Sequence, residues 1–200
     1  MLCPIIEFLL MADCYNNEHS SALNKISARI TEARQFILQF NPDKTVGENC
    51  RDSYLNRWYG NSTEDACNRL TGHFNERFNR MPGELMLLRR YIQNSDPAAF
   101  PVINHFYMVL ADPYYRWASS EYLVDRYNQN RLSISVDAFA IEVRRRLPSD
   151  FVLGTSVRFA RNLLAALRDN GLLIGKNKKE VASPFVPIDS LAYILYALSD

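Results

Sequence analysis

Apolar residues recur at intervals of three and four along most of the chain, which is the period of a helix with one buried side. Leu23, Ile26, Ile30 and Ile37 follow this spacing, and Pro42 ends the segment. Proline and glycine divide the rest of the sequence into segments of similar length. The pattern predicts helices over about 1–13, 23–40, 47–60, 61–80, 82–95, 97–112, 112–129, 135–147, 155–169 and 188–199.

Only two short stretches favour strands, 172–174 and about 181–186, with a turn between them. We therefore predict a mainly all-α protein: a multi-helix bundle with a C-terminal winged-helix-like part that contains one short β-hairpin. The composition changes near Asn128–Leu132, which suggests a helical N-terminal bundle over 1–130 and a winged-helix-like part over 131–200.

Aromatic residues at helical spacing are expected to be core and interhelix packing rather than a ligand-stacking site. Those concerned are Phe106, Tyr107, Tyr114, Tyr115, Trp117, Tyr122 and Tyr127.

Two segments carry residues typical of a helix start. Ser62 and Asp65 stand at the two positions of a capping box, with Asp in place of the usual Glu. Thr155 or Ser156 is expected to cap the helix 155–169. The alternative is a phosphate held by the backbone amides of Gly154–Ser156 at the helix start.

The net charge of +1 conceals an uneven distribution. Residues 126–180 carry eleven Lys or Arg and five Asp or Glu, a net of +6, whereas the remainder carries twelve and seventeen, a net of −5. A basic segment beside an acidic body is typical of proteins that bind polyanions.

On the predicted helix 155–169, the spacing of 100° per residue separates apolar and basic residues. Arg158, Arg161 and Arg168 form one stripe with the small residue Ala165 between them. Such a stripe would let the helix enter a DNA groove while the arginines reach phosphates or guanine edges.

Two other groups of basic residues flank this helix. The preceding helix ends with Arg144, Arg145 and Arg146, and the hairpin turn holds Lys176, Lys178 and Lys179. In a winged helix-turn-helix the second helix enters the major groove and the hairpin touches the backbone beside it. We therefore expect the lysines to contact phosphates; the alternative is that they are merely the solvated residues of an exposed turn.

The stretch "LLAALRDNGLLIGKNKKEVASPFVPIDSLAYILYAL" resembles the C-terminal signature of BrxA-like proteins, small helical components of the bacteriophage-exclusion (BREX) defence systems of bacteria. "GELMLLRRY" and "ADPYYRWASSEYLVDRY" also resemble segments of that family. The resemblance covers about the last 120 residues, is most specific over 163–198, and does not extend to the first 80. It implies a helical protein that binds double-stranded DNA alongside a methyltransferase and ATPases.

Cofactor and catalytic signatures are missing from the sequence. The four cysteines, at 3, 14, 50 and 67, and the three histidines, at 19, 73 and 105, lack the spacing of a zinc site. Scattered cysteines favour reduced thiols and hence a cytoplasmic protein. Phosphate-loop, dinucleotide-binding, hydrolase and metalloprotease motifs are all absent. His73 with Glu76 is a nonspecific pair, Cys67 has no assignable base, and the apolar runs are too short to span a membrane.

We therefore expect a non-enzymatic protein that binds double-stranded DNA in a BREX-type system, without cofactor, small-molecule substrate or membrane contact. Other BREX components are the expected protein partners. The alternative is a protein-interaction module that docks onto such a component without touching DNA, and a nuclease is the third hypothesis.

Overall fold

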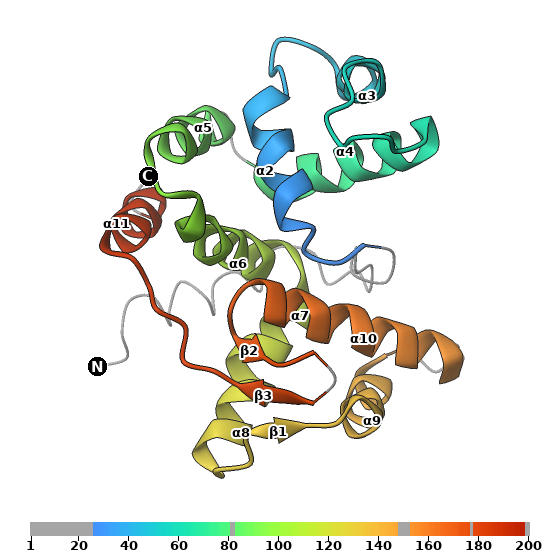
Figure 1. Cartoon of the computed structure of the whole chain (residues 1–200), viewed down its shortest axis with the longest axis vertical. Coiled ribbons are helices and arrows are strands. Elements are labelled where there is room, and N and C mark those ends of the chain that lie inside the picture. The colour runs from blue at the N-terminus through green and yellow to red at the C-terminus, as the bar shows by residue number, and fades with distance from the viewer. Residues whose placement is uncertain (1–25, 81–82, 148–152, 177, 199–200) are drawn as a thin grey trace.

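The computed structural model describes residues 26–80, 83–147, 153–176 and 178–198. The predicted helix over 1–13 lies outside these residues. Helices dominate the described part, as the sequence predicts (Figure 1). The helices are α2 (Ile30–Gln39), α3 (Val46–Leu55), α4 (Glu64–Phe78), α5 (Glu84–Asn94), the 3-10 turn Pro97–Ala99, α6 (Phe100–Ala111), α7 (Pro113–Trp117), the π turn Ala118–Tyr122, α8 (Leu123–Asn128), α9 (Val136–Arg146), α10 (Leu153–Asp169) and α11 (Ile188–Ala197). A small antiparallel sheet lies beside α8, α9 and α10 (Figure 1).

Short polar side chains cap several of these helices. Thr45 and Glu48 form a complete capping box at the start of α3. Thr63 Oγ1 accepts from the Ala66 amide at the start of α4, so the predicted cap at Ser62 was wrong by one residue. Ser62 instead donates to the Tyr59 carbonyl.

The buried apolar residues fall into two clusters. The first core cluster joins α2, α4, α5, most of α6 and α11, and its largest members include Phe36, Phe74 and Tyr107. The second core cluster joins the end of α6 to α7, α8, β1, α9, α10 and β2. The clusters divide inside α6, between Tyr107 and Met108, and α11 returns to the first of them (Figure 1). The division in sequence near residue 130 therefore does not coincide with the division of the core.

Most of the aromatic residues expected in the core are buried, including Tyr115 and Trp117. Tyr127 is an exception, with 58% of its surface exposed. The rings of Trp117 and Phe139 stack with centroids 5.9 Å apart and thereby join the α7–α8 helical segment to α9.

The sheet consists of β1 (Ser133–Ile134), β2 (Leu173–Ile174) and β3 (Lys179–Val181), in the order β1-β3-β2. Both contacts of the central strand β3 are antiparallel. The hairpin was predicted, but β1 was missed because two residues are too few to show alternation.

The second strand of the hairpin was placed too late. It was predicted over 181–186, whereas β3 ends at Val181. Pro184 and Pro187 lack the amide needed for a ladder, and Phe185 is 84% exposed. The apolar run after β3 is therefore a connection that leads into α11.

A chain of buried polar side chains joins the two core clusters. Arg77 of α4 donates from Nη1 to Asn104 Oδ1 of α6 at 3.2 Å, and Asn104 Nδ2 donates to Asn170 Oδ1 at 2.8 Å. Asn170 follows α10, and its Nδ2 donates to the Tyr115 hydroxyl at 2.7 Å. The same hydroxyl lies 3.0 Å from Nδ1 of His105. These five residues, of which His105 is half-buried and the other four are buried, form the buried polar chain, which fixes the end of α10 against α6 and α7.

Candidate nucleic-acid interface

The helix α10 has one buried and one solvent-facing side, as its sequence pattern predicts. Its inward residues fill the second core cluster: Phe159, Ala160, Leu163, Leu164, Ala166 and Leu167. Arg158 and Arg161 are exposed on the opposite side, and Ala165 is half-buried beside them. Within the described ranges, no side chain pairs with Arg161.

The start of α10 differs from the prediction. The helix begins at Leu153, so Thr155 and Ser156 lie within its first turn and not at the cap position. Ser156 is also fully buried. The alternative of a phosphate held by the backbone amides of Gly154–Ser156 stays a prediction, because the first turn of a helix leaves its amides without intrahelical acceptors.

Arg168, the third arginine of the predicted stripe, is less accessible than the first two. Its Nη2 and Nε lie 2.7 Å and 3.2 Å from Oδ1 of Asp169, and the side chain is 38% exposed. This pair neutralises Arg168 within its own helix turn. The basic surface of α10 is therefore centred on Arg158 and Arg161.

Asn162 lies on the solvent side of α10, one helical turn after Arg158, and is half-buried. The charge pattern did not predict this residue, because asparagine is uncharged. An asparagine amide is the typical partner of the major-groove edge of adenine. The same 3.6-residue period that identified the arginines could have identified Asn162.

The hairpin turn exposes two of its three lysines. Lys176 and Lys178 are exposed, and Lys178 Nζ lies 3.2 Å from Oε1 of Glu180. Lys179, by contrast, is only 8% exposed and donates from Nζ to the Lys176 carbonyl at 3.0 Å. The prediction that Lys179 offers its charge at the surface was therefore wrong.

The register of the sheet explains the burial of Lys179. It pairs with Ile134 across the sheet, and paired residues of an antiparallel ladder point to the same side. Ile134 is buried in the second core cluster, so the lysine stem lies on the inward side as well. The neighbouring residue Glu180 pairs with Ile174, which is 58% exposed. The Lys179 ammonium group therefore donates to a carbonyl of the turn and does not extend into solvent.

The three arginines at the end of α9 point in different directions. Arg145 pairs with Glu142 of its own helix at 2.9 Å and is well exposed. Arg146 lies 3.5 Å from Glu121 and places its guanidinium 4.4 Å from the centre of the Trp117 ring. Arg144 is half-buried. Arg146 therefore helps to fasten α9 to the α7–α8 segment.

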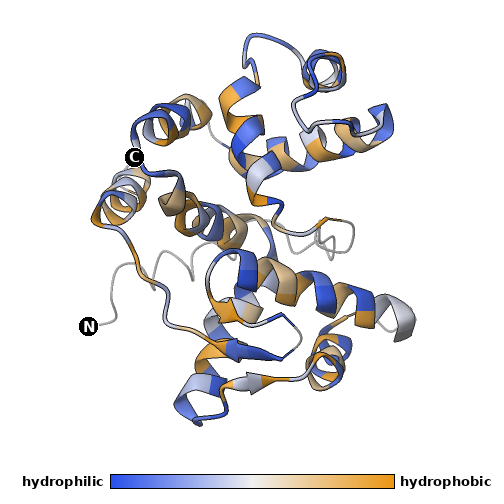
Figure 2. Ribbon diagram, viewed as in Figure 1, coloured by the Kyte–Doolittle hydropathy of each residue, from blue (hydrophilic) through white to orange (hydrophobic). Residues whose placement is uncertain are grey.

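The elements that carry the basic residues are neighbours. α9 packs against α10, and β2 packs against α10. In Figure 1 the β2–β3 hairpin lies beside α9 and α10. Figure 2 shows hydrophilic residues in β3 and at several positions along α10. We define the basic surface by the four exposed basic residues of α10 and the hairpin turn, Arg158, Arg161, Lys176 and Lys178.

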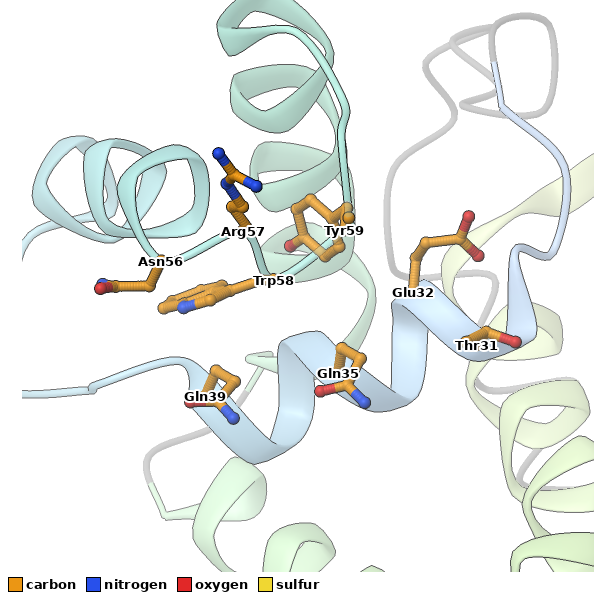
Figure 3. A pocket seen from close by; sticks show the side chains of 9 residues that line it. Thr31, Glu32, Gln35, Gln39, Asn56, Arg57, Trp58 and Tyr59 are labelled. Carbon is orange, nitrogen blue, oxygen red and sulfur yellow. The ribbon is translucent and has the colours of Figure 1, made fainter.

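A separate cleft of about 450 Å³ opens between α2 and the turn after α3 (Figure 3). Gln35 and Gln39 line one side, and Trp58 lies across from them. The lining is mostly polar, and Glu32, its acidic residue, pairs with Arg29 at 3.0 Å. This cleft belongs to the first half of the chain and contains none of the predicted DNA-binding residues.

The described residues include no group of three or more side chains arranged to hold a metal ion. None of the described helices has the length and apolar character that crossing a bilayer requires. Nδ1 of His73 lies 3.6 Å from Oε2 of Glu76, as their spacing of three residues predicts. The Cys67 side chain is buried.

Comparison with models of known protein families gives no match. Comparison with curated proteins gives no significant match either.

Proposed function

We propose that this protein binds double-stranded DNA through the basic surface on α10 and the β2–β3 hairpin, without catalysing a reaction. The arrangement that carries the proposal is the succession β1, α9, α10, β2 and β3 with the sheet order β1-β3-β2. A strand, two helices and a hairpin that pairs with that strand is the order of elements expected of a winged helix-turn-helix, and it supports the proposal.

The exposed arginines of α10 support this role. Arg158 and Arg161 extend from the side of the helix that faces away from the core, with Ala165 on the same side. Such a helix can lie in the major groove, where arginine recognises guanine in a bidentate manner. The segment between α9 and α10 is longer than the turn of a compact helix-turn-helix, so the two helices are held by the second core cluster instead.

The hairpin would contact the DNA backbone beside the groove. Lys176 and Lys178 are exposed at its turn, and each phosphate that they neutralise would release counterions. Affinity for any sequence should then fall as salt rises. The biological setting that we propose, an accessory role in a BREX-type system, rests on the sequence resemblance alone.

The proposal is tested by titrating a labelled duplex with the wild type and two double variants over a salt series. Arg158→Ala with Arg161→Ala should lower the affinity at least tenfold, because each groove arginine typically contributes about 1–3 kcal/mol. Lys176→Ala with Lys178→Ala should weaken binding to all sequences and reduce the slope of log affinity against log salt by about 1–2.

The matched control is Arg51→Ala with Arg90→Ala. Both arginines are exposed on α3 and α5, so this variant loses the same charge from the other part of the molecule. Equal losses of DNA affinity in the control and in the α10 variant would show that the effect comes from the net charge of the protein and not from the basic surface. Unchanged affinity in both basic-surface variants would contradict DNA binding and favour a surface that docks onto another protein.

A further inference from the structure

Helix α11 is apolar on two opposite sides. Its inner side is fixed to the first core cluster: Tyr193 is buried, and its hydroxyl lies 2.7 Å from that of Tyr107. Ser190 is also buried and shares a hydrogen bond of 2.9 Å with Tyr91. These contacts fix which side of α11 faces the core and therefore which side faces solvent.

The outer side of α11 carries large apolar residues. Ile188 is 82% exposed, and Leu191 and Leu195 are about half exposed, at 45% and 48%. Their spacing of three and four residues places them in one row. Phe185, at 84%, and Val186, at 44%, are exposed in the segment immediately before the helix. We name these five residues the apolar strip.

A helix that is apolar all round is normally covered on every side. Single exposed apolar residues are common, but five large ones close together in the sequence indicate an interaction surface. In Figure 1, helix α11 lies at the edge of the molecule, on the opposite side of the view from α10.

The charge around the strip restricts what can cover it. Between residues 181 and 198 the sequence has one charged residue, Asp189, and no lysine or arginine. A helix that lies on a lipid surface usually has basic residues on its polar side. The strip also offers almost no charge with which a charged partner protein could form ion pairs. A neutral apolar surface, however, can meet a copy of itself without repulsion between like charges.

The size of the strip fits a modest interface. If an aromatic side chain offers about 200 Å², the exposed fractions of the five residues correspond to roughly 500–600 Å² in each chain. With neighbouring atoms included, two such surfaces approach the lower bound of about 1,200 Å² for a specific interface.

We propose that α11 forms a two-fold symmetric dimer with a second copy of this chain. In an antiparallel arrangement about an axis between Leu191 and Ala192, Ile188 of one chain would pack against Leu195 of the other. Leu191 would lie over the partner's Ala192, whose small exposed side chain lets the two helices approach closely. This dimer does not depend on DNA binding, and it leaves the basic surface of each chain accessible.

Sedimentation of the full chain over about 1–100 µM tests the proposal. The wild type should show a concentration-dependent dimer, and Leu191→Glu and Leu191→Lys should each be monomers because a charge near the axis meets its own copy. An equimolar mixture of the two variants should restore a heterodimer. The control Leu55→Lys changes a leucine on α3 that is 61% exposed and should leave the dimer intact.

A wild type that stays monomeric throughout this range would overturn the dimer, and the strip would then have another occupant, either another protein or the first 25 residues of the chain. Single variants that still dimerise would overturn the use of α11. A mixture that remains monomeric would overturn the antiparallel pairing. Circular dichroism of each variant confirms folding, and the DNA titration described above is independent of all these outcomes.

Discussion

At the scale of single residues, the environment of each basic side chain determines what it can do. Arg161 and Lys176 are exposed, Arg168 is neutralised by Asp169, and Arg146 is fastened to Trp117. Their formal charges are equal, but their capacity to contact a polyanion is not. Guanidinium and ammonium groups that are buried stabilise the fold, whereas exposed ones can still contact DNA, including Lys178 with its weak ion pair to Glu180.

Lys179 provides the clearest test of this distinction. We expect Lys179→Ala to lower the free energy of unfolding by about 1–2 kcal/mol, because its charged hydrogen bond to the Lys176 carbonyl closes the hairpin. Lys178→Ala should cost less than about 0.5 kcal/mol, since an exposed ion pair contributes little. Urea denaturation of both variants measures the difference. An equal decrease in the free energy of unfolding in both variants would mean that the Lys179 side chain lies in solvent.

At the scale of elements, the hairpin depends on one glycine. Gly175 has a φ of +85°, and a Cβ at this position would lie 2.0 Å from the Lys178 carbonyl oxygen. Any side chain therefore meets both a strained backbone and a direct clash with the turn. α10 has no such dependence, because its amphipathic pattern and the second core cluster position it.

Gly175→Ala should consequently disrupt the hairpin while α10 remains folded. We expect DNA affinity to fall about as much as in the variant that lacks Lys176 and Lys178, with helical circular dichroism unchanged. The control is Gly72→Ala in α4, where no atom lies within 4 Å of the added Cβ. This variant should be more stable by roughly 0.5–1 kcal/mol and bind DNA normally. If the Gly175→Ala variant binds DNA with the affinity of the wild type, the hairpin is not part of the DNA interface.

At the scale of the whole molecule, the buried polar chain couples the two core clusters. Burial lowers the pKa of Arg77 to about 10 and that of His105 to about 4. His105 is therefore neutral at physiological pH and can accept the Tyr115 hydroxyl hydrogen, while that hydroxyl accepts from Asn170. The position of the end of α10 thus depends on an uncharged histidine on α6.

This arrangement predicts a loss of stability in mild acid. In the unfolded chain His105 titrates near pH 6.5, but in the folded protein it does so only near pH 4. Between these values the unfolded state binds more protons, so stability falls as the pH falls from about 7 to 4. The loss should reach about 2–3 kcal/mol.

Urea denaturation across this pH range measures the effect. The variant His105→Gln keeps a hydrogen-bonding side chain without an ionisable group, so it should show a weaker pH dependence. Exposed histidines and carboxylates contribute equally to both proteins and cancel in the comparison. Identical pH profiles would show that His105 is not buried in its neutral form.

The sequence by itself determined the helices and the amphipathic character of α10, because a period of 3.6 residues records which side of a helix is buried. It also located the hairpin by its glycine and lysines. It could not identify β1, whose two residues are a strand only because β3 lies beside them. Nor could it show that Lys179 points inward, since that direction depends on its pairing with Ile134.

The return of α11 to the first core cluster and the exposure of the apolar strip were decided only by the tertiary structure. Local periodicity depends on neighbours within a few residues, whereas burial of an all-apolar helix depends on contacts with distant segments. Tyr193 with Tyr107 and Asn104 with Asn170 are pairs separated by dozens of residues. Such contacts form only when the whole chain is folded, and they determine which charges and which apolar residues remain at the surface.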